Sequence, residues 1–402
     1  MRHHECLTTE SKMHIPARIR DIAPAIMDEI GARVKELSDH GADVIDLAGG
    51  VPSLPPVDSA LRSARQALDD PATHLYGADA GLLSLREGLS AWLSANHGMK
   101  VDPATEIVIT AGANQAFMLA VLTLLEPGDK VLLPSPFYFN HEMTVRIAGG
   151  IPVEVPLREE EGFQLTLADL EPYLDMEPRM LVVVSPNNPT GAVYDPQELR
   201  RAARFLASRG IVIISDETYG HFVYEGAQHL SVGSLPECRS QVITIGSFSK
   251  TFSLSGWRVG YLVAESDFVQ QAIKVQDCML VCTPLISQRA ALGALKTPLE
   301  ELSRRRAIMS EQRQLLARRL AEIPRLQWHP TRGAYYAFVH VEDCTDSAAL
   351  ARDLLETARV ATVPGSVYGH NGEGFLRLSY GSVSKVELEE ACTRLSKYLA
   401  AW

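Results

Sequence analysis

Residues 247–261, SFSKTFSLSGWRVGY, are the most informative stretch of this chain. Lys250 follows an apolar run, is flanked by the hydroxyls of Ser247 and Ser249, and precedes Arg258 by eight residues. Desolvation and nearby positive charge lower the pKa of a lysine, so that a neutral amine is available near pH 7. Hydroxyls and a guanidinium are the groups that bind a phosphate monoester. A surface lysine in a serine-rich loop is the alternative, so other segments have to decide.

Short apolar runs alternate with amphipathic segments on both sides of this stretch. The predicted strands cover 107–110, 130–134, 180–185, 211–215, 241–247 and 256–264, and the clearest helices cover 114–125 and 196–208. Nearly continuous apolar strands are typical of a mostly parallel sheet wrapped by helices, which is the α/β class. Polar and Gly/Pro residues follow several strands, at the edge where such sheets bind ligands.

The pattern changes after about residue 290. An Arg-rich helical segment at 298–322 precedes expected strands at 334–339 and 374–381 and a helix near 347–358. These elements predict a smaller α+β domain, with an N-terminal helix over 16–38 packed against it. We therefore expect a flexible tail at 1–15, a large cofactor-binding domain at 50–290, and a small domain made of 16–49 with 291–402.

Composition excludes several classes of partner. The chain has 402 residues and a net charge of -11, which argues against nucleic acids and anionic membranes as main partners. No apolar run reaches the length of a membrane helix or of a signal-peptide core. The six cysteines are scattered without paired zinc-ligand spacing, so we expect no metal site, reduced thiols and a cytoplasmic protein.

The lysine segment resembles the signature of the class I/II aminotransferases, which are fold type I enzymes that use pyridoxal 5'-phosphate. Further segments resemble the same family in the same order, from about residue 16 to residue 381. The resemblance implies that Lys250 forms the Schiff base with the cofactor. Ser247, Ser249 and Arg258 would then bind the phosphate of the cofactor.

Two loops resemble further cofactor contacts of the family. TAGANQAF (110–117) is similar to the turn that opens a helix beneath the phosphate, which assigns Gly112, Ala113 and Asn114 to phosphate binding. SPNNPTG (185–191) is similar to a loop whose asparagine, here Asn188, bonds the phenolic oxygen of the cofactor next to the substrate. Helix capping and an ordinary Pro/Gly turn are the alternatives.

SDETY (215–219) resembles the segment that faces the cofactor ring. Asp216 would keep the pyridine nitrogen protonated, and Tyr219 would bond the phenolic oxygen. Asp216 could instead be a helix cap.

PFYFNHEM (136–143) resembles the segment that packs on the same ring. Tyr138 would stack on the ring, and His141 would support Asp216. A histidine packed on a helix face is the alternative for His141.

Two segments resemble substrate contacts. Arg377, in GFLRLS (374–379), occupies an apolar strand where an unpaired charge is unfavourable, and it matches the arginine that binds the substrate α-carboxylate. A structural salt bridge is the alternative. Gly50, in DLAGGVPSLPP (46–56), would lie near that carboxylate, although Ser53 and Leu54 depart from the family's pattern there.

LYGADAGLLSLREGL (75–89) resembles the segment whose tyrosine, here Tyr76, reaches the phosphate bound by a neighbouring subunit. This implies a homodimer with shared active sites. A surface tyrosine ahead of a helix is the alternative.

The resemblance implies an aminotransferase that moves an amino group from an L-amino acid to a 2-oxo acid. Several segments look most like enzymes for aromatic amino acids or methionine, which favours an aromatic or large neutral donor. Tyr138, Tyr335, Tyr336 and residues 26–27 could line its pocket, or belong to the core.

A lyase or synthase on the same fold is the alternative reaction. The sensor half of a DNA-binding regulator is another class, for which the short segment before Pro16 leaves no room.

Overall fold

The computed structural model describes residues 13, 15–23 and 26–402, so nearly all of the predicted tail at 1–15 lies outside the described residues. Its main element is a seven-stranded sheet. In spatial order the strands are β2 (Ile107–Thr110), β8 (Gly260–Val263), β7 (Val242–Ser247), β6 (Val212–Asp216), β5 (Met180–Val184), β3 (Lys130–Ser135) and β4 (Ile151–Pro156). Only β8 runs antiparallel to its neighbours, so the predicted mostly parallel sheet is confirmed.

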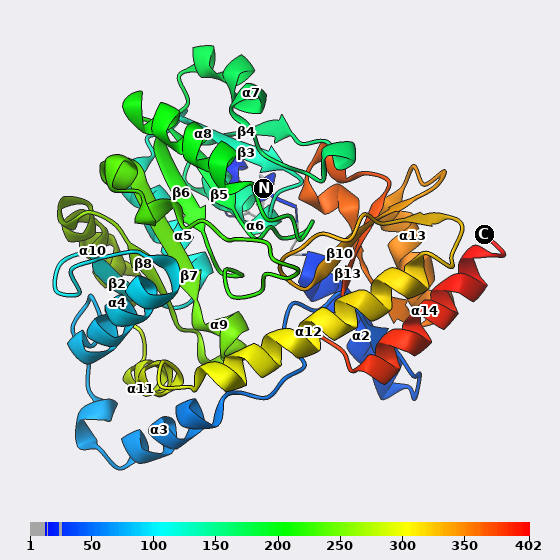
Figure 1. Cartoon of the computed structure of the whole chain (residues 1–402), viewed down its shortest axis with the longest axis horizontal. Coiled ribbons are helices and arrows are strands. Elements are labelled where there is room, and N and C mark those ends of the chain that lie inside the picture. Colours follow the sequence, from blue (N-terminus) through cyan, green and yellow to red (C-terminus); the bar gives the residue numbers. More distant parts are fainter. Residues whose placement is uncertain (1–12, 14, 24–25) are drawn as a thin grey trace, which may run out of the picture.

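Helices cover both faces of this sheet (Figure 1). Apolar side chains of one face pack against α5 (Ala113–Leu124), α6 (Phe139–Ile147) and α10 (Ser266–Leu280). The other face packs against α7 (Leu167–Leu170) and α8 (Pro196–Ser208). At the end of this face formed by β2 and β8, the sheet packs against α3 (Asp58–Leu68), α4 (Leu83–His97), α9 (Phe248–Thr251) and α11 (Leu285–Ala294). Burial on both faces explains why the strands are apolar along almost their whole length.

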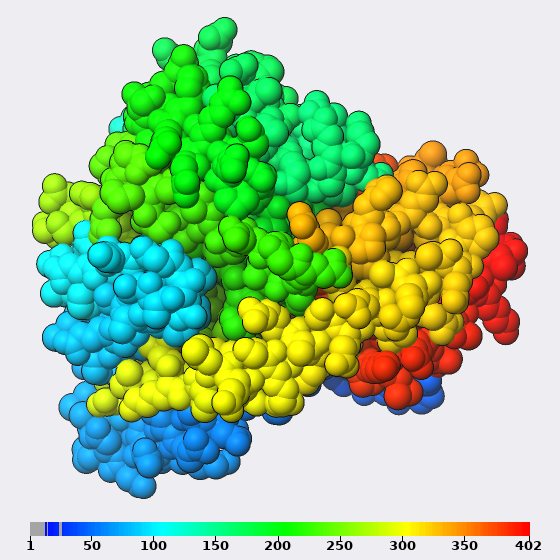
Figure 2. Space-filling view, in the orientation of Figure 1, coloured from blue at the N-terminus to red at the C-terminus, as the bar shows by residue number. Residues whose placement is uncertain are grey.

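A second sheet lies in the C-terminal part of the chain. Its four antiparallel strands are β12 (Val363–Pro364), β13 (Phe375–Ser379), β10 (Tyr336–Val341) and β9 (Leu326–Gln327). It shares an apolar core with α12 (Leu299–Leu320), α13 (Ser347–Asp353) and α14 (Lys385–Leu399). A short parallel pair, β1 (Ile45–Asp46) with β11 (Val360–Ala361), joins the N-terminal segment to this part. Figure 2 shows α12, in yellow, running along the surface from the N-terminal half to α14.

The N-terminal helix differs from its prediction. In place of one helix over 16–38, the chain forms α1 (Ala17–Arg20) and α2 (Ile26–Asp39). The sequence has a proline at position 24, and a proline disfavours helical backbone in the residue before it, which accounts for the interruption. Within the described residues, no helix is long and apolar enough to span a membrane.

Candidate active site

A cavity opens where three neighbouring strands end. Val184, Asp216 and Ser247 are the last residues of β5, β6 and β7, and all three line it. The predicted site residues on its wall are Ala113, Asn114, Tyr138, Asn188, Asp216, Tyr219, Ser247, Ser249, Lys250 and Arg258. The sheet therefore brings together residues from five separate segments of the chain.

Lys250 lies in α9, directly after β7. Burial, together with the positive charges of Arg377 and Arg258, lowers the pKa of Lys250 to about 8, against the opposing effect of Asp216. The Lys250 ammonium donates a hydrogen bond to the carbonyl oxygen of Gly50, which also accepts one from Tyr335 at 2.9 Å. Lys250 is therefore an amine that loses its proton close to neutral pH.

Asp216 and His141 form a buried pair. His141 Nε2 lies 3.3 Å from Asp216 Oδ2, and both side chains are almost fully buried. The backbone N–H of Thr218 donates to the Asp216 Oδ1 atom at 3.0 Å. The ring of His141 also packs against Phe117 and Tyr138. The carboxylate is thus held in one orientation at the end of β6.

One end of the cavity is suited to an anion. Ser247 and Ser249 are joined by a hydroxyl–hydroxyl hydrogen bond of 2.8 Å. Arg258 donates to the carbonyl oxygens of Ser255 and Ala111, at 3.0 and 3.1 Å. Gly112 begins α5 with a φ of +85°, and a Cβ at this position would stand 2.4 Å from Arg258 Nη2. Glycine is therefore required for the close approach of Arg258 to the start of α5.

Arg377 is buried on β13, and its guanidinium is held from several sides. Nη1 donates to Asn188 Oδ1 at 2.9 Å, and Nη2 donates to the carbonyl oxygen of Ala48 at 2.6 Å. The guanidinium carbon lies 4.4 Å from the centre of the Tyr336 ring and 5.5 Å from that of Tyr368. Among the residues the structure describes, no carboxylate lies within ion-pair distance of Arg377, which counts against a structural salt bridge.

Sequence reasoning missed one residue of this site and gave another a different role. Thr218 lines the cavity, and its buried Oγ1 has no hydrogen-bond partner among the described residues. Its position between Asp216 and Tyr219 is the signal that could have identified it. Tyr336 was considered only for the substrate pocket, but its hydroxyl lies 2.7 Å from that of Tyr219, so it orients that side chain.

Tyr76 lies apart from the other predicted site residues. Its side chain is 86% exposed in the single chain and does not line the cavity. Leu75, Met279 and Leu280 are also exposed. Within one subunit, Tyr76 therefore contributes nothing to the site.

Sequence and structure comparisons point to the same group of proteins. Residues 42–395 match the family "Aminotransferase class I and II". The chain belongs to this family. It is 36% identical to a probable aspartate/prephenate aminotransferase of Aquifex aeolicus, over 96% of this chain and 98% of that protein. It is also 36% identical to aromatic-amino-acid aminotransferase 2 of Thermococcus litoralis, over 89% and 92%.

Solved structures of aminotransferases share the fold. The aromatic aminotransferase from Pyrococcus horikoshii superposes with a TM-score of 0.86 at 36% identity, covering 92% of this chain and 99% of that one. The aspartate aminotransferase from Thermus thermophilus with maleate gives 0.88 at 31% identity, covering 96% and 99%. These similarities confirm the predicted fold type I architecture. They also confirm the predicted reaction class, so the alternative of a lyase or synthase is not supported.

As a member of this family, the chain is an aminotransferase that uses pyridoxal phosphate and acts on amino acids and 2-oxo acids. The cavity fits this cofactor: an amine that titrates near neutral pH, a buried carboxylate and an anion-binding end share one wall. When bound, the cofactor supplies an aldehyde that takes up the amino group and a pyridine ring that accepts electrons from the substrate Cα.

Proposed function

We propose that this aminotransferase uses an aromatic or large neutral L-amino acid as its donor, with Lys250 as the lysine that binds the cofactor and carries the proton. Lys250 Nζ would accept the proton from the substrate Cα, for which an amine with a pKa near the working pH is suited. The lowered pKa of this one buried amine, on the wall shared with Asp216, is the observation that carries the assignment.

The remaining residues would divide the binding of the cofactor. We assign Asp216 to the pyridine nitrogen, with His141 as its support, and Asn188 with Tyr219 to the phenolic oxygen. Tyr138 would stack on the ring. The phosphate would be bound by the start of α5 and by the hydroxyls and guanidinium at the same end, namely Gly112, Ala113, Asn114, Ser247, Ser249 and Arg258. The arrangement of these side chains around one cavity supports the division.

Arg377 would bind the substrate α-carboxylate, next to Gly50. A buried guanidinium without a carboxylate partner among the described residues is costly, and a bidentate anion offsets this cost. The side-chain oxygen of Asn188, a residue of the cavity wall, accepts a hydrogen bond from Nη1 of Arg377 and so holds the guanidinium beside that wall. The substrate would thereby be aligned with Lys250 in both half-reactions.

The aromatic side chains in and beside the cavity support an aromatic or large neutral amino acid as the donor. Tyr138 lines the cavity, and Tyr336 covers one side of Arg377. Of the arginines in the described part of the chain, Arg258 alone lines the cavity, and we assign it to the phosphate. One subunit therefore offers aromatic surface and no further guanidinium for a second carboxylate on the donor.

Aspartate is the second candidate, because relatives named aspartate aminotransferase are as similar as the aromatic ones; that of Pyrococcus abyssi is also 36% identical. The test is kcat/KM for phenylalanine, tyrosine, methionine and aspartate with one 2-oxo acid acceptor. We expect the neutral donors to exceed aspartate by roughly tenfold or more, since a buried unpaired carboxylate is costly. A preference for aspartate would contradict the donor class alone, whereas no 2-oxo acid from any donor would contradict the catalytic assignment.

We further propose a homodimer in which Tyr76 of one subunit reaches the phosphate site of the other. The exposure of Tyr76 and of its apolar neighbours in the single chain supports this.

The division into a large domain at 50–290 and a small one from 16–49 with 291–402 is supported by the two sheets, which lie within 107–263 and 326–379. All five cysteines in the described part of the chain are free, as in a reducing compartment such as the cytoplasm.

A further inference from the structure

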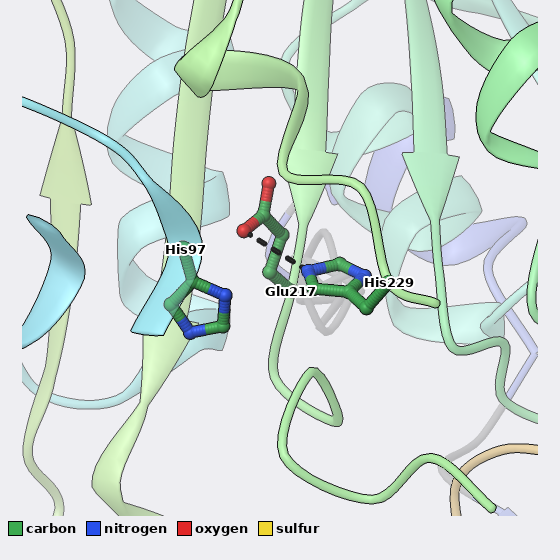
Figure 3. Close-up of side chains that lie close together, drawn as sticks. All are labelled: His97, Glu217 and His229. Atoms are coloured by element: carbon green, nitrogen blue, oxygen red, sulfur yellow. Dashed lines mark hydrogen bonds and ion pairs between the residues drawn. The ribbon is translucent and has the colours of Figure 1, made fainter. Parts of the chain in front are cut away.

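Three side chains with metal-binding atoms meet away from the wall of the Lys250 cavity. His97 is the last residue of α4, Glu217 directly follows β6, and His229 belongs to the loop beyond it. Their ligand atoms all lie within 4.8 Å of one another, and Figure 3 shows the two imidazoles on either side of the Glu217 side chain. We propose that His97, Glu217 and His229 bind one zinc ion, with a water molecule as the fourth ligand.

The spacing of these side chains is compatible with ligands of one ion. His229 Nε2 lies 3.3 Å from Glu217 Oε2. Ligand atoms about 2.1 Å from a tetrahedral zinc stand ~3.4 Å apart, which is close to the length of this hydrogen bond. The ring centres of His97 and His229 are 5.5 Å apart. Two imidazoles on one tetrahedral ion have centres about 5 Å apart.

A small space borders two of the three residues. A cavity of about 10 Å³ is lined by His97 and Glu217 but not by His229, and apolar side chains such as Trp92 and Phe248 form part of its wall. Such a volume holds about one water molecule or one ion.

Burial affects the pKa values of two of these side chains. Burial lowers the pKa of His97 to about 4, so its imidazole is neutral at pH 7, and its ring makes no hydrogen bond with the described residues. Burial by itself would raise the pKa of Glu217. The hydrogen bond from His229 and the neighbouring imidazoles outweigh burial, and they hold this pKa below its usual range. A carboxylate and two imidazoles are a common ligand set of zinc.

Outer contacts orient the carboxylate toward the histidines. The hydroxyls of Ser215 and Ser231 each donate to Glu217 Oε1 at 2.9 Å, while Oε2 is the atom nearest His229. Such second contacts typically fix the ligands of a metal site. His97 also ends a 15-residue helix, whose C-terminal end carries partial negative charge and favours a cation.

The site would connect α4 to the segment that carries the catalytic carboxylate. Glu217 is the residue after Asp216, and its backbone N–H donates to Ile245 on β7 at 2.9 Å. The side chains of neighbouring residues point to opposite sides of a strand end, so the ion would not touch the Lys250 cavity. Its effect would be to stabilise this segment, rather than to take part in amino transfer.

The experiment measures metal content and stability of the untagged holoenzyme. After chelator treatment and removal of the chelator, the protein is titrated with zinc, and bound metal is measured by mass spectrometry. We expect about one zinc per subunit and a Tm that rises with zinc concentration. Cobalt(II) as a probe should give the intense visible bands of a tetrahedral site. His97→Gln and His229→Gln should weaken zinc binding by at least about tenfold, whereas the exposed His40→Gln should not.

Several results would overturn the proposal. They are a wild-type Tm that is equal in zinc and in chelator, absence of cobalt bands, or the same zinc content in His97→Gln and in wild type. The first two need no variant, so a variant that fails to fold does not weaken the test. Bound cofactor is monitored by its own absorbance, which separates loss of zinc from loss of the active site.

Discussion

The guanidinium of Arg377 donates from Nη1 to the side-chain oxygen of Asn188 over 2.9 Å. The two residues are 189 positions apart, since Arg377 lies on β13 of the second sheet and Asn188 lies in the loop after β5 of the first. Because Oδ1 of Asn188 accepts this bond, its Nδ2 group remains to donate toward the cavity. One contact thus links the proposed carboxylate site to the proposed cofactor site.

Arg377→Lys tests the carboxylate site. Lysine keeps the charge but loses the bidentate fork and the donor to Asn188. We expect kcat/KM to fall for every amino acid by about 1.5–3 kcal/mol, with little effect on amines that lack a carboxylate. Arg313→Lys is a matched control, because Arg313 is equally buried but pairs with Glu225 away from the cavity. Equal losses for amino acids and plain amines would show that Arg377 is structural.

The lowered pKa of Lys250 predicts how the apoenzyme takes up its cofactor. Only the neutral amine attacks the cofactor aldehyde, and the pKa of about 8 lies well below the ordinary value of 10.5. The rate of covalent uptake should therefore fall about tenfold per pH unit below pH 8 and level off above it. Arg377→Met removes a positive charge and should raise the midpoint, whereas the exposed Arg201→Met should not move it. Stopped-flow absorbance gives the profile.

Lys250→Ala checks the position of this covalent link. The variant should fold, yet borohydride should attach no cofactor to it. The exposed Lys274→Ala should behave as wild type. A reduced adduct mapped by mass spectrometry to any other lysine would show that Lys250 has been assigned wrongly.

His141→Gln tests the support of Asp216. Loss of the contact between His141 Nε2 and the carboxylate should lower kcat by roughly tenfold or more, corresponding to a hydrogen bond to a charged group of about 1.5–3 kcal/mol. It should also shift the pH dependence of the bound cofactor's absorbance, because Asp216 would be less firmly oriented. A variant with reduced Tm but an unchanged absorbance titration would mean that His141 is a packing residue. His40→Gln is the exposed control.

The shared site is tested by mixing inactive variants. Tyr76→Ala mixed with Lys250→Ala should recover activity beyond that of Tyr76→Ala alone, because one site of the heterodimer would be wild type. Lys250→Ala mixed with Arg377→Ala should recover none, since both residues act within one subunit. Tyr76→Phe should weaken cofactor retention by about 1.5–3 kcal/mol. A fully active monomer by light scattering would contradict the shared site.

Local patterns in the sequence were enough for the strands, and the family resemblance added the reaction class and most of the residues of the cavity. The apolar runs at 107–110 and 180–185 predicted strands, because burial on both faces requires an apolar side chain at each position. Polar residues at the ends of such strands meet at one edge, so Asp216, Ser247 and Lys250 could be placed together. One long N-terminal helix was expected wrongly, because its helical periodicity was given more weight than the proline at position 24.

Only the tertiary structure decided which side chains touch. Tyr335 and Tyr336 are neighbours in the sequence and both buried, yet Tyr336 is the one whose hydroxyl reaches Tyr219 at 2.7 Å. The register of β10 with β13, in which Phe338 faces Arg377, places Tyr336 beside that arginine. His97 and Glu217 are likewise far apart in the chain, and no spacing rule links them. Periodicity reports which face of an element is buried, whereas a contact between distant residues depends on how the elements pack.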